Sequence, residues 1–174
     1  MTDVLVGRLV KPFGIRGELK LHPAEDFWED VLESKRLTLR WETDDVVKER
    51  DITFTRYRPH GNCYVVCVDG VNDRNSAETF VGRDIYINSE KIDVPLPDQK
   101  LPFQVLGAVV KSEDGEVLGE VTSVIFSAAH DVYEVGNDER SFMVPAVSEF
   151  IVSIDEEKRE IVIRPLPGLI ADEK

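Results

Sequence analysis

Cysteine and histidine, the residues that most often build reactive or metal sites, are scarce: the 174 residues include two cysteines and three histidines. Cys63 and Cys67 fall on one face of an expected strand, roughly 13 Å apart, which is beyond disulfide reach. We therefore expect two buried, reduced thiols. His22, His60 and His130 are scattered, and none has zinc-ligand spacing to a cysteine or carboxylate. The sequence predicts no metal site.

Long apolar runs are also missing. No run approaches the roughly 20 residues that span a bilayer, and the first residues show no basic region followed by an apolar stretch. We expect a cytoplasmic protein with no membrane partner.

Motifs of energy-coupled or hydrolytic enzymes are absent as well. The chain has neither a Gly-x-x-x-x-Gly-Lys-Ser/Thr phosphate loop nor a Gly-x-Ser-x-Gly nucleophile elbow. Ser127, His130 and Asp131 are close in sequence and suggest a hydrolase as a minor alternative. A triad needs its side chains to converge in space, however, and loops between strands routinely contain these residue types. We expect no enzymatic activity and no cofactor.

Positive charge is in short supply, with 21 basic against 34 acidic residues and a net charge of -13. Such a chain is not drawn non-specifically to a polyanion, so a nucleic-acid partner would need a local basic patch. Residues 1–100 carry a net charge of -4 and residues 101–174 carry -9. The sign reverses in the first 24 residues, which contain Arg8, Lys11, Arg16 and Lys20 against Asp3 and Glu18. This face can also include Arg36, Arg40, Arg56 and Arg58 if the fold brings them near.

The basic patch coincides with a glycine-rich connection between two expected strands, 4–10 and 19–21. Glycines let main-chain N–H groups approach an anion, and Arg16 adds a guanidinium, so this connection can contact phosphate. The candidate RNA- or ribosome-binding residues are Lys11, Gly14, Ile15, Arg16, Gly17 and Lys20. The alternative is a long hairpin connection with charged ends and no binding role.

Three prolines within residues 94–102 interrupt regular structure and indicate a linker. We expect one domain over 1–93, a linker over 94–101, and a second domain with a tail over 102–174.

Alternating apolar residues predict strands at 4–10, 18–22, 36–41, 46–57, 63–68 and 84–87, then at 105–111, 117–126, 132–135, 141–144, 151–154 and 161–164. Short helices are predicted at 72–81, capped by Asn72, and at 27–32. The expected fold is all-β, with two small antiparallel β-barrels.

Several motifs occur in one order along nearly the whole chain. They are Val-Gly-Arg-Leu-Val-Lys-Pro-Phe-Gly-Ile-Arg-Gly-Glu-Leu-Lys, then Val-Asn-Asp-Arg-Asn-Ser-Ala-Glu-Thr-Phe-Val-Gly, and later Leu-Gly-Glu-Val, Val-Pro-Ala-Val and Pro-Leu-Pro-Gly-Leu. In these the chain resembles the ribosome maturation factor RimM family. The resemblance implies an amino-terminal six-stranded barrel and a carboxy-terminal PRC-type barrel. It also implies a non-enzymatic assembly factor that binds the immature head of the small (30S) ribosomal subunit, through the 3′ domain of 16S rRNA and ribosomal protein S19.

One departure concerns the start of the second barrel. Family members often carry an adjacent aromatic pair there, whereas residues 100–107 read Lys-Leu-Pro-Phe-Gln-Val-Leu-Gly. The resemblance then implies Leu101 and Phe103 as partner-binding residues, although packing of the linker accounts for both equally well. An acidic second barrel suits a basic ribosomal protein. We expect a monomer, and the alternative function is a PRC-barrel interaction scaffold without an RNA role.

Overall fold

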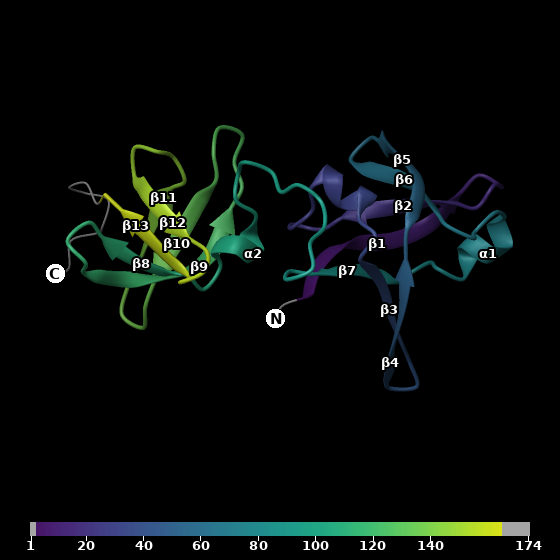
Figure 1. The fold of residues 1–174 in the computed structure, drawn as a ribbon, viewed down its shortest axis with the longest axis horizontal. Helices are drawn as coiled ribbons and strands as arrows, with labels where there is room; N and C mark the ends of the chain where they lie inside the picture. The colour runs from purple at the N-terminus through teal and green to yellow at the C-terminus, as the bar shows by residue number, and fades with distance from the viewer. Residues whose placement is uncertain (1–2, 165–174) are drawn as a thin grey trace. The chain divides into compact units, whose positions relative to one another are not determined.

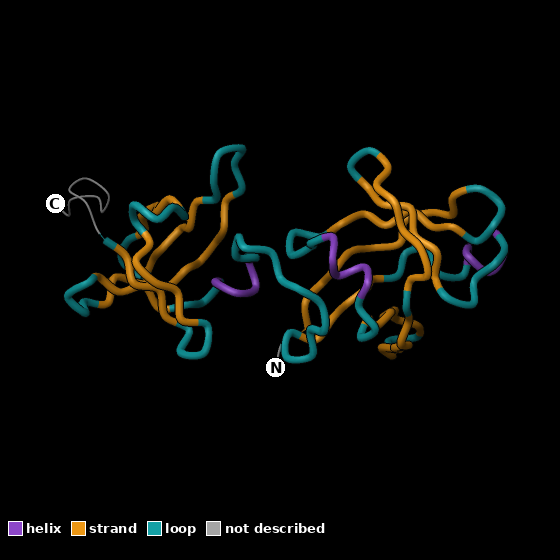
Figure 2. Tube along the Cα trace, turned by 45° about the horizontal axis from the view of Figure 1, so that its top comes forward, coloured by secondary structure: helices purple, strands orange, loops and turns teal. Residues whose placement is uncertain are grey.

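The computed structural model describes residues 3–164, and the chain divides into two compact units, 1–101 and 102–174. Strands dominate both units and helices are short (Figures 1 and 2). The prediction of an all-β protein with a few short helices is confirmed. The tail predicted beyond residue 164 lies outside the described residues.

The first unit is one curved sheet. Its strands are β1 (Asp3–Phe13), β2 (Glu18–Pro23), β3 (Leu37–Thr43), β4 (Val46–Ile52), β5 (Phe54–His60), β6 (Cys63–Val68) and β7 (Asp84–Asn88), in the order β4-β3-β7-β1-β2-β6-β5. The two edge strands, β4 and β5, are consecutive in the chain and are separated only by Thr53. The sheet therefore curves until its edges meet at that residue. The strand predicted over 46–57 is divided here, so the sheet has seven strands where the resemblance implied six.

Period-two alternation explains why these segments form strands. On β1 and β2, the side chains of Val4, Val6, Leu19 and Leu21 are at most 2% exposed, and the residues between them face outward. Fully burying an aliphatic side chain of this size contributes about 1.5–3 kcal/mol. The inner face therefore holds the sheet together, and the outer face is left for polar and charged groups.

Three short helical segments occur in the described residues. Helix α1 (Arg74–Glu78) begins after Asp73, whose carboxylate accepts a 2.7 Å hydrogen bond from the Ser76 N–H. The predicted helix over 72–81 is therefore present but shorter, and its cap is Asp73 rather than Asn72. The helix predicted at 27–32 is a 3-10 helix, η1 (Glu29–Glu33). The third, α2 (Pro102–Val105), opens the second unit.

The start of the linker is attached to the first unit. The Trp28 Nε1–H donates to the Pro95 carbonyl at 2.7 Å, and Asp93 accepts from the Ser34 hydroxyl at 2.5 Å and from the Lys35 N–H at 2.9 Å. Burial opposes ionisation of Asp93, but these hydrogen bonds outweigh it and hold the pKa of the carboxyl below its usual value. Residues 93–95 are thus fixed against η1 and the segment after it.

The second unit is a six-stranded sheet. It contains β8 (Val109–Ser112), β9 (Val117–Ile125), β10 (Val132–Gly136), β11 (Ser141–Pro145), β12 (Ile151–Asp155) and β13 (Glu160–Ile163), in the order β11-β10-β9-β8-β13-β12. Two details differ from the prediction. β13 and β8 pair in parallel, whereas all pairs were expected to be antiparallel. Residues 102–105 are helical, so the strand predicted over 105–111 is shorter.

A glycine allows a close backbone approach in this second sheet. A Cβ at Gly119 would lie 2.7 Å from the carbonyl oxygen of Gly136, and Gly119 has φ of +152°. β9 and β10 can therefore approach each other at this point only because the side chain is missing. This close approach accounts for the glycine of the Leu-Gly-Glu-Val motif.

Candidate nucleic-acid interface

Two lysines face each other at the base of the predicted loop. Lys11 on β1 and Lys20 on β2 are direct Cα partners, just past a register shift between Leu9 and Lys11. Like charges placed directly opposite each other destabilise a strand pair. Lys11 is exposed and Lys20 is half-buried. The pair therefore favours an anion at this end of the sheet.

The loop between these strands has a fixed backbone and an exposed tip. Gly14 and Gly17 have φ of +71° and +91°, and a Cβ at Gly17 would lie 2.6 Å from the Val71 carbonyl oxygen. Ile15 is 78% exposed and Arg16 is exposed beside it. Arg74 of α1 donates from Nη1 to the Gly14 carbonyl at 3.0 Å. The structure thus brings all six predicted residues together and adds Arg74 to them.

An aromatic residue next to the loop was missed by sequence reasoning. Phe13 lies between Arg58, whose guanidinium carbon is 5.5 Å from the ring centroid, and His60, whose ring meets it edge-on at 5.0 Å. Arg58 also forms a 2.7 Å ion pair with Glu18. No local pattern links β5 to this loop, because the contact depends on the pairing of β5 with β6 and of β6 with β2.

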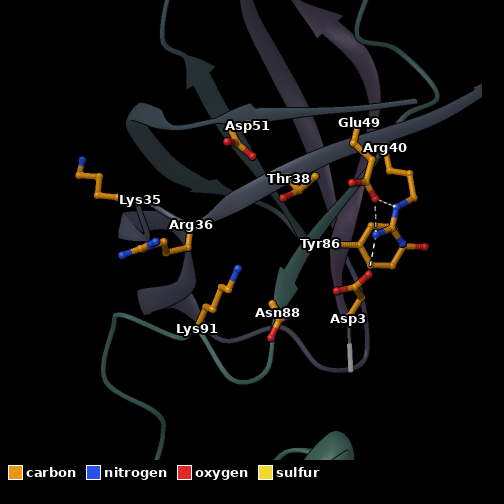
Figure 3. Close-up of a pocket in the computed structure, with 10 residues that line it drawn as sticks. All are labelled: Asp3, Lys35, Arg36, Thr38, Arg40, Glu49, Asp51, Tyr86, Asn88 and Lys91. Atoms are coloured by element: carbon orange, nitrogen blue, oxygen red, sulfur yellow. Dashed lines mark hydrogen bonds and ion pairs between the residues drawn. The ribbon is translucent and has the colours of Figure 1, made fainter. Parts of the chain in front are cut away.

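The sequence also suggested that four arginines of the first unit could extend the basic face, and the structure places them in two separate locations. Arg56, like Arg58, is on β5, and its Nη2 is 3.5 Å from the Cys67 sulfur. Arg36 and Arg40 instead line a cavity of about 540 Å³ on the outer face of β3, β4 and β7 (Figure 3). Figure 3 shows Arg40 between two carboxylates, and its Nη2 is 2.6 Å from Asp3 and 2.7 Å from Glu49. Arg40 is therefore occupied by structural ion pairs.

The residues of the hydrolase alternative do not form a relay. The Ser127 hydroxyl donates to the main-chain carbonyl of His130, and Nδ1 of His130 is 3.1 Å from the main-chain carbonyl of Asp131. The serine proton is therefore directed at a carbonyl and not at the imidazole. Within residues 3–164, no three metal-ligating side chains are grouped closely enough to hold an ion.

Both cysteines are free thiols, with Cys67 buried and Cys63 only half-buried, which corrects the expectation for the latter. In the part of the chain that is described, no helix is long and apolar enough to cross a membrane.

The second unit presents a different surface. Leu101 and Phe103, at the end of the linker and the start of α2, are half-buried, and the Phe103 carbonyl accepts from Arg159 at 3.4 Å. A more exposed apolar row, not predicted from the sequence, crosses the outer face of β9, β10 and β11. Ile125 pairs with Val132, which pairs with Pro145, and Met143 lies opposite Glu134 in the adjacent row. Ile125 and Met143 are 42% and 45% exposed.

Comparison with known proteins agrees with this two-part organisation. The family model for the RimM N-terminal domain matches residues 4–92, and the model for the RimM PRC barrel domain matches residues 102–169. The chain belongs to the RimM family. The resemblance predicted from the motifs is therefore confirmed.

Individual RimM relatives match over nearly their full length. Ribosome maturation factor RimM of Prosthecochloris aestuarii is 36% identical over 162 residues, which cover 92% of this chain and 93% of the relative. The Azoarcus sp. ribosome maturation factor RimM is 32% identical over 163 residues, covering 91% and 95% of the two chains. A crystal structure of a 16S ribosomal RNA processing protein RimM from Pseudomonas aeruginosa is 26% identical, covers 95% of this chain and 99% of its own, and has a TM-score of 0.46.

Proposed function

We propose that this chain is a non-enzymatic maturation factor of the small (30S) ribosomal subunit, acting in the cytoplasm as a monomer. Membership of the RimM family supports a role in ribosome maturation, because both parts of the chain match and the relatives are named for that role. The observation that carries the RNA-binding part is the opposed Lys11–Lys20 pair beneath an exposed glycine loop. The proposed target is the immature subunit head.

The loop is suited to the backbone of 16S rRNA, in its 3′ domain. Lys11, Lys20 and Arg16 supply charge, and exposed Gly14 gives phosphates access to main-chain N–H groups, whereas buried Gly17 fixes the loop against Val71. Arg74 holds the Gly14 carbonyl and so reduces the freedom that the loop would lose on binding. Contacts of this type position a protein on RNA and do not read its sequence.

The second unit is suited to ribosomal protein S19. Residues 101–174 carry a net charge of -9, which complements a basic partner. The exposed apolar side chains of Ile125 and of Met143 in the adjacent row give such a partner an area to bury. Leu101 and Phe103, implied by the family resemblance, stay proposed partner-binding residues.

Substitution of Arg16 by Glu tests the RNA contact. We expect this variant to co-sediment with immature small subunits about ten-fold less well than the wild type, and to unfold at the same denaturant concentration. Lys91→Glu is the matched control, because it makes the same charge change at an exposed position in the cavity of Figure 3. Equal loss in both variants, or no loss in either, would remove the loop from the RNA contact.

The exposed apolar row also favours one alternative, a PRC-barrel interaction scaffold without an RNA role. The dependence of affinity on salt separates the two functions. Each phosphate contact to a single strand adds about 0.7 to the slope of log affinity against log salt. Binding to immature subunits that is nearly independent of salt would support the scaffold.

A further inference from the structure

The hairpin of β3 and β4 projects from the first unit and has two different faces (Figure 1). Directly opposed residues of an antiparallel pair share a face. On one face, buried Leu39 pairs with Arg50, and Trp41 pairs with Lys48. This face is continuous with the core. The other face carries Arg40 with Glu49 and belongs to the cavity in Figure 3.

Two guanidinium groups gather around aromatic rings on the core-side face. The guanidinium carbon of Arg83 is 3.9 Å from the Trp41 ring centroid and 5.8 Å from that of Phe80. Arg50 approaches the same Phe80 ring at 5.6 Å. Phe80 is 4% exposed, whereas Trp41 is half-buried and Arg50 and Lys48 are exposed. The cluster is thus built on the core but open to solvent.

Within the described part of the chain, neither of these two arginines has a carboxylate partner to neutralise it, unlike four other arginines of the first unit. In the first unit, salt bridges pair other arginines with acids: Arg8 with Asp84, Arg40 with Asp3 and Glu49, Arg58 with Glu18, and Arg74 with Glu78. Among the residues that the structure describes, neither Arg50 nor Arg83 forms such a pair. Burial, and secondarily the charge of Arg50, lower the pKa of Arg83. An anion bound near both guanidinium groups would offset the repulsion between Arg50 and Arg83.

The surroundings favour a nucleic acid as the source of that anion. Unpaired bases stack on aromatic rings and on arginine planes, and phosphates accept hydrogen bonds from guanidinium groups. Trp41 and Arg83, both half-buried, already form a cation–π contact, and exposed Lys48 and Arg50 lie on the same face of the hairpin. Building on the RNA-binding role proposed above, we propose that Trp41, Lys48, Arg50 and Arg83 bind a single-stranded RNA segment at a second site on the first unit.

Hydrogen bonds connect the second site to the glycine loop between β1 and β2. The segment after α1 pairs with β1, since the Gly82 N–H donates to the Leu9 carbonyl at 2.7 Å and the Leu9 N–H donates to the Arg83 carbonyl at 3.0 Å. At the other end of the helix, Arg74 holds Gly14. One short stretch of chain, residues 74–83, therefore joins the two basic sites. An RNA held at the loop raises the effective concentration of neighbouring nucleotides at the hairpin.

The test is binding of the full chain to a fluorescein-labelled, unstructured RNA of roughly 10–15 nucleotides at low salt. We expect the double variant Arg50→Gln with Lys48→Gln to bind about ten-fold more weakly than the wild type, with a salt slope smaller by about 0.7 for each lost contact. The matched control, Arg36→Gln with Lys91→Gln, removes the same charge from the other face and is expected to change affinity by less than about two-fold.

The change in tryptophan fluorescence on adding RNA provides a second measurement. A general loss of positive charge would not by itself alter the environment of Trp41. Trp28 is 6% exposed and bonded to the linker, so an RNA-dependent change in emission is expected from Trp41. That change should saturate with the binding curve and disappear in Trp41→Phe, which still offers a ring to Arg83.

Each result has a distinct meaning. If the wild type fails to bind the RNA, both the RNA-binding function and this site are overturned. If the wild type binds and the hairpin variant binds equally well, only the hairpin site is overturned. Equal losses in the hairpin and control variants would show a general charge effect and overturn the site. Full displacement of the RNA by poly-glutamate at equal charge would indicate that the site binds an acidic protein segment. That result would also overturn the proposed RNA site.

Discussion

The guanidinium of Arg74 donates a 3.0 Å hydrogen bond to the carbonyl oxygen of Gly14, 60 residues earlier in the chain. This contact fixes a loop that its own sequence would leave mobile, because Gly14 allows many backbone conformations. A loop held in one conformation loses less entropy on binding. The helix that supplies Arg74 is therefore part of the candidate interface, although α1 was predicted only as a structural element.

Replacing Arg74 by Met should loosen the loop and leave the fold intact. The hydrogen bond is exposed, so we expect a loss of less than about 1 kcal/mol in the free energy of unfolding. Amide hydrogen exchange at residues 14–17 should become faster. Glu78→Gln is the control, since it removes the 3.4 Å ion pair to Arg74 and leaves the bond to Gly14. Unchanged exchange in Arg74→Met would show that the bond does not restrain the loop.

The two loop glycines should respond differently to alanine. Gly17→Ala combines a positive φ with a 2.6 Å approach of the new Cβ to the Val71 carbonyl, and should cost about 2–5 kcal/mol. Gly14→Ala meets open space, so only the backbone penalty of about 1–2 kcal/mol applies. Denaturant unfolding followed by tryptophan fluorescence reports on the first unit alone, because Trp28 and Trp41 both belong to it. Equal costs would contradict the close approach at Gly17.

Local patterns were sufficient to predict most of the fold. Alternation located the strands, and the glycine and proline positions located the loop and the linker. The division at Thr53 could not be found this way, because the alternation continues through it. Its carbonyl accepts from the Asp69 N–H at 2.9 Å, a contact made only in the folded sheet. The parallel pairing of β13 with β8 likewise has no local signal.

The candidate site was predictable only where its residues are consecutive. Lys11 to Lys20 form one connection, so their proximity follows from the sequence. Arg58 and Arg74 join them through strand pairing and helix placement. At 102–105 the apolar pattern was ambiguous between strand and helix, and Pro102 at the first helical position is the signal that could have indicated α2.

Asp93 should make the attachment of the linker sensitive to acid. Its hydrogen bonds depress the pKa of the folded state below the value of 3.8 expected when unfolded. The stabilisation is therefore present above that value and is lost as the pH falls through the lower, folded pKa. We expect Asp93→Asn to destabilise the first unit at pH 7 and to match the wild type in strong acid. A difference between the two proteins that stays constant down to the acid limit would contradict this.

If S19 is the partner, as proposed, substitutions in the apolar row of the second unit should weaken its binding more than substitutions on β12 do. Ile125→Lys places a positive charge against a basic partner and should weaken binding to isolated S19 by about ten-fold or more, measured by titration calorimetry. Val152→Lys is the matched control, with 43% exposure against 42% for Ile125, on the edge strand β12, which is not a neighbour of β9. Equal affinities for the two variants would exclude this face.

The central claim is tested most directly by co-sedimentation of the wild-type chain with immature small subunits, mature small subunits and large subunits. We predict binding to the immature small subunit, little binding to the mature one and none to the large subunit, with affinity falling as salt rises. Equal binding to all three particles, or binding to none, would contradict the proposed role in small-subunit maturation.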